Sequence, residues 1–182
     1  GDVYKRQCKM SSNESYILQA KLYDPQGNIV WNGNMQDTFE IPVENTSLWS
    51  SEYPNLYQLE IVLYDANNEI IETIQEQVGF RKFTLEYGIM KLNGKRIVFH
   101  GINRHEWNAK TGRAITYEQM EEDIHMLKAL NINAVRTSHY PNNSYWYKLC
   151  DQYGIYVIDE MNLETHGAND ICLLYTSDAA DD

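Results

Sequence analysis

Residues 131–158 have the pattern of a β-strand, a helix and a second β-strand, and this unit constrains the fold more than any other part of the chain. The run AVRT at 134–137 is prone to β structure, and Gly154 stands where a helix C-cap would lie. Between them, apolar side chains recur with helical spacing at Trp146, Leu149, Cys150 and Tyr153. The continuous apolar run at 155–158 predicts a strand that is buried on both faces. Such a unit is a right-handed βαβ crossover with parallel strands.

Polar side chains cluster directly after both strands of this unit. After the first strand and then after the second, they are Arg136, Ser138, His139, Asp159, Glu160, Asn162, Glu164 and His166. In parallel α/β architectures, the carboxyl edge of the sheet is where ligands bind and chemistry is done. The sequence therefore predicts a functional site at this edge.

Two further elements precede the unit. Residues 88–95 predict a hairpin with an Asn-Gly turn, followed by a first barrel strand at 96–103 and its loop at 104–107. Thr116 begins a helix with Gln119 completing a capping box, and the expected buried stripe is Met120, Ile124, Leu127 and Leu130. A complete (β/α)₈ barrel needs about 250 residues, so we expect roughly five of its strands to be absent from this chain.

The first half of the chain predicts short strands punctuated by turns. The expected strands are at 15–23, 29–31, 38–43, 56–64 and 69–74. Several strands at this spacing indicate an antiparallel β-sandwich. Four aromatic residues there could stack on a sugar, but we expect at least three of them to serve the core or a domain interface: Trp31, Trp49, Tyr53 and Tyr57.

Four motifs occur in one order along the chain: NRHE at 103–106, VRTSHYPN at 135–142, YGIYVIDE at 153–160 and NLETHG at 162–167. Together they resemble glycoside hydrolase family 2, most closely its β-galactosidase branch. β-Glucuronidases and β-mannosidases share the RTSHYP and YG-hydrophobic-DE motifs, whereas the NLETHG ending favours a galactosidase.

The resemblance implies a multidomain β plus α/β fold. An immunoglobulin-like β-sandwich domain at 8–82 would be followed at 83–170 by the N-terminal part of a truncated TIM-barrel catalytic domain. Residues 1–7 and 171–182 resemble translated adapter or vector sequence, so we expect non-native tails there, with native flexible tails as the alternative.

The implied activity is a retaining hydrolysis of terminal non-reducing β-D-galactose residues, as in lactose-type substrates. Glycoside hydrolysis needs two carboxyl groups across the scissile bond. In the family both catalytic glutamates lie downstream, the acid/base directly after an asparagine, but the Asn-Glu pairs here lie at 13–14 and 68–69 in the sandwich half. We therefore expect no catalytic glutamate in this chain and no activity from the fragment alone.

The resemblance assigns substrate binding and transition-state stabilisation to His105, His139, Arg136 and Asn103. Hydrogen bonds or partial positive charge near the sugar hydroxyls strengthen as oxocarbenium character develops. For each histidine, the alternative is a hydrogen bond to neighbouring backbone. For Arg136, a structural ion pair with Asp159 or Glu160 is an equal alternative.

Glu164 and His166 match magnesium ligands of the family, which a downstream glutamate completes there. The acid-x-His spacing alone is a weak signal, because five histidines and 26 acidic residues give about 0.7 such pairs by chance. The resemblance thus implies a Mg²⁺ site that is incomplete in this chain, and a monovalent cation in the full-length enzyme.

The charge balance restricts the partners. Fifteen basic and 26 acidic residues give a net charge of −11, which repels nucleic-acid phosphates, and no apolar run approaches the ~20 residues that span a bilayer. The three cysteines lack metal-ligand spacing, and free thiols indicate the cytoplasm. The resemblance adds a β-galactoside as substrate and a homo-oligomer as the full-length state.

Two alternatives remain open. The first is a fragment of a β-glucuronidase or β-mannosidase, which a sugar-acid recognition motif beyond these residues would decide. The second is a non-catalytic β-sandwich binding module. The apolar helix faces at 120–127 and 146–153 weigh against the module, because they need a barrel to cover them.

Overall fold

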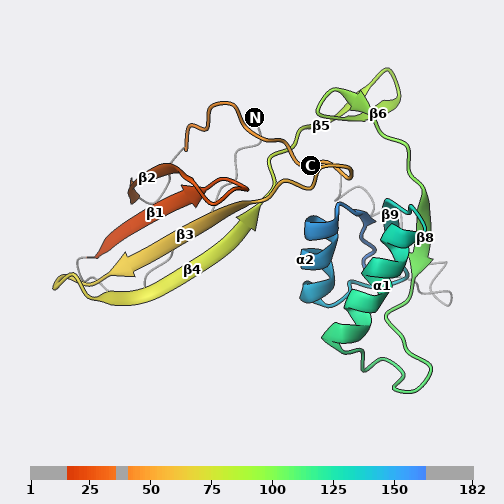
Figure 1. Cartoon of the computed structure of the whole chain (residues 1–182). Coiled ribbons are helices and arrows are strands. Elements are labelled where there is room, and N and C mark those ends of the chain that lie inside the picture. Colours follow the sequence, from red (N-terminus) through yellow and green to blue (C-terminus); the bar gives the residue numbers. More distant parts are fainter. Residues whose placement is uncertain (1–15, 36–40, 163–182) are drawn as a thin grey trace, which may run out of the picture.

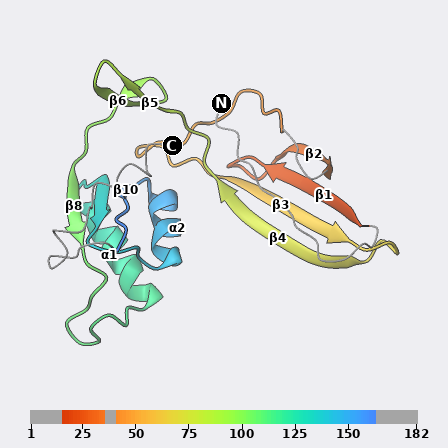
Figure 2. The same ribbon diagram turned by 180° about the vertical axis from the view of Figure 1, so that it is seen from behind.

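The computed structural model describes residues 16–35 and 41–162. Within these ranges the two halves of the chain lie side by side, a β-sheet in the first half and a mixed α/β unit in the second (Figures 1 and 2). The expected strand at 38–43 falls partly outside the described residues, and residues 41–43 are not in a strand. Both expected tails, with Cys8 and Cys172, also lie outside them.

The first half forms a four-stranded antiparallel sheet in the order β2-β1-β3-β4. Its strands are β1 (Ile17–Tyr23), β2 (Ile29–Met35), β3 (Tyr57–Tyr64) and β4 (Ile70–Val78). Alternating side chains of β1 and β3 make its core: Leu18, Ala20, Leu22, Tyr57, Leu59 and Ile61. The strands predicted at 15–23, 29–31, 56–64 and 69–74 are confirmed and pair antiparallel, and the described residues of this half supply one layer of the sandwich.

Similar turns close both hairpins of this sheet. The Asp24 carboxylate accepts a hydrogen bond from the backbone N–H of Asn28 at 2.8 Å. The Asp65 carboxylate accepts one from the backbone N–H of Glu69 at 2.8 Å. An aspartate that bonds to backbone within its own turn fixes the reversal, and with it the register of the strands.

A small second sheet contains β5 (Phe83–Glu86), β6 (Ile89–Leu92) and β7 (Lys95–Arg96). Asn93 and Gly94 both have positive φ, 53° and 79°, as the predicted tight turn requires. The predicted barrel strand at 96–103 was wrong in extent, because the turn pairs Arg96 with β6. The barrel strand β8 is Gly101–Arg104.

The parallel unit has the strand order β10-β9-β8. Strand β9 is Ala134–Thr137 and β10 is Tyr156–Ile158, and β9 pairs in parallel with both neighbours. Helix α1 (Tyr117–Ala129) connects β8 to β9, and α2 (Ser144–Tyr153) connects β9 to β10. The parallel strand–helix–strand arrangement predicted from the sequence is therefore confirmed.

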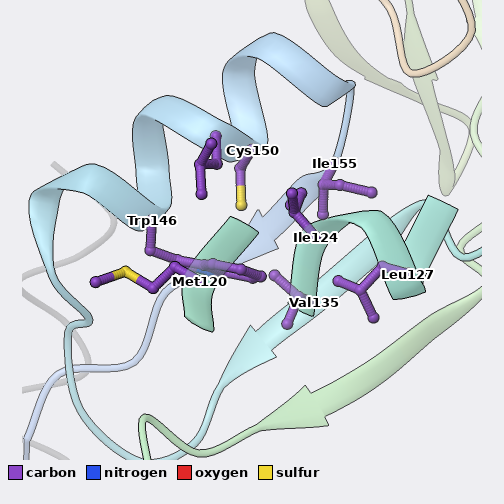
Figure 3. Packing of buried hydrophobic residues seen from close by; sticks show 8 residues of the cluster. Met120, Ile124, Leu127, Val135, Trp146, Cys150 and Ile155 are labelled. Carbon is purple, nitrogen blue, oxygen red and sulfur yellow. The ribbon is translucent and has the colours of Figure 1, made fainter. Parts of the chain in front are cut away.

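The start of α1 and the end of α2 lie where the sequence predicts. Thr116 and Gln119 form the capping box of α1, and Gly154 caps α2 with a φ of 71°. The two helices pack against β9 through a shared apolar cluster (Figure 3). Its buried members are Met120, Ile124, Leu127, Val135, Trp146, Leu149, Cys150 and Ile155.

Two burial predictions were wrong. Leu130 is 65% exposed, because α1 ends at Ala129 and Leu130 is its C-cap, which turns away from the stripe. Strand β10 is not buried on both faces, since Ile158 is 54% exposed. Strand β10 lies at one edge of the three-stranded sheet, so it has a paired neighbour on one side only within the described residues.

Trp49 joins the two halves. Its indole N–H donates to the backbone oxygen of Asp151 at 2.7 Å, its own carbonyl accepts from Asn93 Nδ2 at 3.0 Å, and its ring meets the Tyr156 ring edge-on at 5.8 Å. Of the four aromatic residues considered for sugar stacking, Trp49 and Tyr57 are buried and Trp31 packs on the sheet core. The structural role expected for at least three of them is confirmed.

None of the helices in the described part of the chain has the length and apolar character needed to cross a bilayer.

Replacing Gly154 by alanine should destabilise the chain more than replacing Gly27. Both glycines have positive φ, which costs an alanine about 1–2 kcal/mol. At Gly154 the new methyl group would also strike the Ser51 backbone, with its Cα at 2.9 Å, whereas nothing lies within 4 Å at Gly27. Urea unfolding of the 182-residue chain should therefore show an extra loss of about 1–3 kcal/mol for Gly154→Ala, and equal losses would contradict this packing.

The Cys150 thiol should be unreactive in the folded chain. Burial raises the pKa of Cys150 from 9.0 to about 12, which leaves about 1,000-fold less thiolate at pH 8 than in an exposed cysteine. The Cys150 pKa is higher in the folded chain than in the unfolded chain. The free energy of unfolding therefore contains a contribution from the protonated thiol that is complete below pH 9.0 and is lost as the pH rises towards about 12. In a Cys8→Ser, Cys172→Ser background, Ellman's reagent should react at pH 8 only after denaturation. Equally fast reaction of the native chain would contradict the burial.

Candidate active site

Strand pairing brings the three strand ends to one edge of the parallel sheet. Asn103 of β8 lies opposite Arg136 of β9, and Arg136 lies opposite Ile158 of β10. The loops that follow the three strands therefore start next to one another. The three strand ends thus meet at one edge, as the parallel arrangement predicts, and the function of that edge stays a prediction.

Glu160 connects the polar side chains of this edge. Its Oε1 accepts hydrogen bonds from Nε and Nη2 of Arg136, and its Oε2 lies 3.0 Å from Nδ1 of His139. Arg136 also donates from Nη1 to Oδ1 of Asn103 at 3.4 Å. Burial alone would raise the pKa of Glu160, but the bonds from Arg136 and His139 outweigh it and hold the pKa below 4.5. Glu160 is therefore ionised at neutral pH.

The two histidine rings lie side by side. The ring centroids of His105 and His139 are 5.4 Å apart and the planes meet at 71°. The peptide bond between Ser138 and His139 is cis. Together with Glu160, the four residues predicted for substrate binding form one group, which we call the strand-end site: Asn103, His105, Arg136, His139 and Glu160.

Arg136 lies both in an ion pair and within the group of polar side chains predicted for substrate binding. The ion pair with a neighbouring carboxylate exists, with Glu160, while the same guanidinium also reaches Asn103 and lies 3.3 Å from His139 Nδ1. The expectation that Asn103 belongs to this network holds in the geometry. Arg136 is held by its neighbours on three sides, which fixes its direction.

Thr137 and Asp159 stabilise the strand-end site through hydrogen bonds at its buried side. Sequence analysis did not identify Thr137 as part of the site. The fully buried Thr137 hydroxyl donates to Asp159 Oδ1 at 2.8 Å and accepts from the backbone N–H of Glu160 at 3.0 Å. Tyr147 of α2 donates to the same Asp159 oxygen at 2.7 Å. Burial and then this bond raise the pKa of Tyr147 to about 12. The one signal for Thr137 in the sequence is its place inside the RTSHYP motif.

Arg104 is a second residue that sequence analysis missed. It is buried at the end of β8, and its guanidinium carbon lies 3.8 Å from the ring centre of Trp146. Its Nη1 donates to Asn142 Oδ1 at 2.7 Å, and its Nε donates to Asp123 of α1 at 3.1 Å. Arg104 thus ties β8 to both helices and to the loop that carries His139.

The described carboxylates of this edge are all engaged. Glu106 accepts from the backbone N–H of Asn143 at 3.0 Å, at the start of α2. Asp159 takes two hydroxyl donors, and Glu160 takes Arg136 and His139. A general acid for glycoside cleavage needs a raised pKa, which is the opposite of the shift at Glu160. Glu160 is therefore not suited to act as that acid, and its contacts with Arg136 and His139 serve to orient these side chains.

Both predicted magnesium ligands, Glu164 and His166, lie outside the described residues. Within the described ranges, no three histidine, cysteine or acidic side chains gather in a way that could hold a metal ion.

Comparison with known proteins gives matches along nearly the whole chain. Residues 83–181 match the model "Glycosyl hydrolases family 2, TIM barrel domain", and residues 5–81 match the model "Glycosyl hydrolases family 2". These matches confirm the expected fold class, a sandwich domain followed by the start of a TIM barrel.

Two similar proteins are both named β-galactosidases. That of Halalkalibacterium halodurans is 53% identical over 167 residues, which are 89% of this chain and 16% of that protein. That of Bifidobacterium adolescentis is 49% identical over 159 residues, 85% of this chain and 15% of that protein. The chain thus spans about a sixth of the length of these relatives.

A similar solved structure is the β-glucuronidase from Ruminococcus gnavus in complex with D-glucuronic acid. It superposes with a TM-score of 0.75 at 29% identity, over 82% of this chain and 26% of that one.

Replacing Thr137 by valine should lower the free energy of unfolding of the chain. Valine keeps the shape but removes the hydroxyl, so Asp159 loses a donor and the backbone N–H of Glu160 loses its acceptor. We expect a loss of about 1–3 kcal/mol in urea unfolding. The control is Thr84→Val, because the Thr84 hydroxyl bonds only to the exposed Glu86 carboxylate, and there the loss should stay below about 0.5 kcal/mol. Similar losses at both positions would contradict the role given to Thr137.

Proposed function

This chain belongs to glycosyl hydrolase family 2, and on that premise we propose that it is part of a retaining β-galactosidase. The proposed substrates carry a terminal non-reducing β-D-galactose residue, as lactose does. One observation carries the proposal: the named relatives at 49% and 53% identity are β-galactosidases, whereas the superposed β-glucuronidase is 29% identical.

In this proposal the strand-end site forms one wall of the sugar pocket. His105 and His139 present their rings together at the edge of the sheet, where they meet the sugar hydroxyls. Hydrogen bonds between fixed side chains and the sugar hydroxyls strengthen as positive charge develops on the sugar ring in the transition state. Arg136 and Asn103 keep this wall rigid, because each is bonded within the site.

The two catalytic carboxyl groups are proposed to lie outside this chain. The carboxylates of the described edge are occupied by donors, and Glu160 has a lowered pKa. The chain therefore supplies binding and orientation, while protonation and attack depend on glutamates elsewhere in the whole enzyme.

Magnesium is proposed as a cofactor, with Glu164 and His166 as ligands and a third ligand elsewhere in the enzyme. The support is the NLETHG motif at 162–167. An ion there would add fixed positive charge beside the pocket. Titration of Mg²⁺ into the whole enzyme tests this, since Glu164→Gln should weaken binding, and unchanged affinity would contradict the assignment.

The cellular setting is also a proposal. The free, buried Cys150 thiol suits a reducing cytoplasm, and the enzyme is proposed to act as a homo-oligomer. A non-cytoplasmic location in cell fractionation, or a monomer by light scattering of the whole enzyme, would contradict these two points.

A second candidate function is that of a β-glucuronidase, which the superposition with the Ruminococcus gnavus structure favours. A uronic acid carries a carboxylate, so a site that binds it needs a positively charged side chain to pair with that carboxylate. Arg136 is the cation of the strand-end site, and its guanidinium is already paired with Glu160. A neutral sugar such as galactose fits this site better.

Exchange of segments should separate the two functions. The 182-residue chain alone should not hydrolyse 4-nitrophenyl β-D-galactoside. When the matching part of this chain replaces the 167 matching residues of the Halalkalibacterium halodurans enzyme, the chimera should cleave galactosides to within about 10-fold of the parent. The control graft into the Ruminococcus gnavus β-glucuronidase should not restore glucuronide cleavage.

Two outcomes would overturn the proposal. Turnover by the chain alone would contradict the absence of catalytic carboxyl groups. Glucuronide cleavage by the second graft, with a folded but inactive first graft, would favour the glucuronidase.

A further inference from the structure

The Nδ1 atom of His139 has two polar neighbours with opposite demands. Glu160 Oε2 lies 3.0 Å away and, as an ionised carboxylate, can only accept a hydrogen bond. Arg136 Nη2 lies 3.3 Å away and can only donate. One ring nitrogen cannot donate and accept at the same time. The tautomer of His139 therefore depends on which of these two neighbours forms the hydrogen bond with Nδ1.

The geometry decides in favour of Glu160. The contact with Glu160 is the shorter one, and it joins a donor to a charged acceptor, which makes a hydrogen bond strong. Arg136 Nη2 does not depend on His139 for a partner, because one of its two hydrogens faces Oε1 of the same carboxylate. The hydrogen therefore sits on Nδ1 of His139 and is donated to Glu160.

We propose that Glu160 is a positioning residue that fixes His139 as the Nδ1–H tautomer, so that the acceptor lone pair is on Nε2. In that state Nε2 can accept a hydrogen bond but not give one, so a ligand hydroxyl that meets Nε2 would be the donor. Sugar hydroxyls are donors as well as acceptors, so this assigns the direction of the contact between His139 and a sugar. The functional meaning rests on the proposed glycosidase activity, but the tautomer itself does not.

Glu160 is suited to this role because its own position is fixed. One carboxylate oxygen belongs to Arg136 and the other to His139. Its backbone N–H is held by the buried hydroxyl of Thr137. A residue held at one backbone and two side-chain atoms cannot exchange its two carboxylate oxygens without breaking the ion pair with Arg136.

Glutamine at this position should reverse the tautomer. Arg136 offers only donors, so the amide oxygen of Gln must face Arg136, and the amide NH₂ must then face His139. An NH₂ group can only donate, so Nδ1 of His139 must accept, and the hydrogen moves to Nε2. The side chain keeps its size, so this test changes the donor pattern and little else.

The experiment is NMR of the imidazole nitrogens in the 182-residue chain, labelled with ¹⁵N-histidine, at pH 8. A His139→Gln variant identifies the signals of His139 among those of the five histidines. In the unmodified chain, we expect the Nδ1–H form to exceed the Nε2–H form by at least about 10-fold. In Glu160→Gln, the ratio should reverse by a similar factor.

The control is Glu106→Gln, which removes a neighbouring carboxylate that bonds to Asn143 and not to His139. It should leave the His139 tautomer unchanged. The signals of His100 and His125 report whether each variant is folded.

An Nε2–H tautomer or a doubly protonated ring in the unmodified chain at pH 8 would overturn the proposal, whatever the variants do. So would a folded Glu160→Gln variant with the original tautomer. Because no turnover is measured, failure of the β-galactosidase assignment would leave this result intact, and the reverse also holds.

Discussion

Parallel pairing of β8, β9 and β10 is the constraint on which the strand-end site depends. Strand β9 is hydrogen-bonded on both sides, so Asn103, Arg136 and Ile158 lie in one row across the sheet. In a parallel sheet all three chains leave at the same edge, and the polar residues that follow them meet there without further folding. Pairing a neighbour in the opposite direction would send its polar residues to the other end.

The site is stabilised in layers beneath that edge. Helices α1 and α2 bury one face of the sheet through residues such as Ile124 and Trp146. Above this apolar layer, Arg104 and Thr137 satisfy polar groups that burial would otherwise leave unpaired. Glu160 then divides its two oxygens between Arg136 and His139. The strand-end site is thus held by bonds to buried groups, which is how a site keeps its geometry before a ligand arrives.

Sequence patterns predicted the features that depend on neighbours along the chain. The capping box at Thr116, the turn at Asn93 and the left-handed cap at Gly154 are local, so the residue types identify them. The motifs also identified His105 and His139, which lie together at the predicted edge. The end of α1 was missed, because helical periodicity continues through Leu130 although the chain has already turned.

The contacts between distant residues could not be predicted in the same way. Thr137 and Arg104 look like ordinary strand residues in the sequence, and their partners are 22 and 38 positions away in Asp159 and Asn142. For Arg136, the residue types allowed a pair with either Asp159 or Glu160. Which carboxylate faces it depends on the path of the backbone after β10, and only the folded chain settles that in favour of Glu160.

A crystal structure of an active enzyme that contains this chain, with galactose bound, tests the central claim most directly. The sugar should lie against the carboxyl edge of β8, β9 and β10, with a hydroxyl oxygen within ~3.2 Å of a ring nitrogen of His105 or His139. Galactose bound in a catalytic pocket elsewhere, with both rings turned away from it, would contradict the assignment of this edge as a wall of the sugar site.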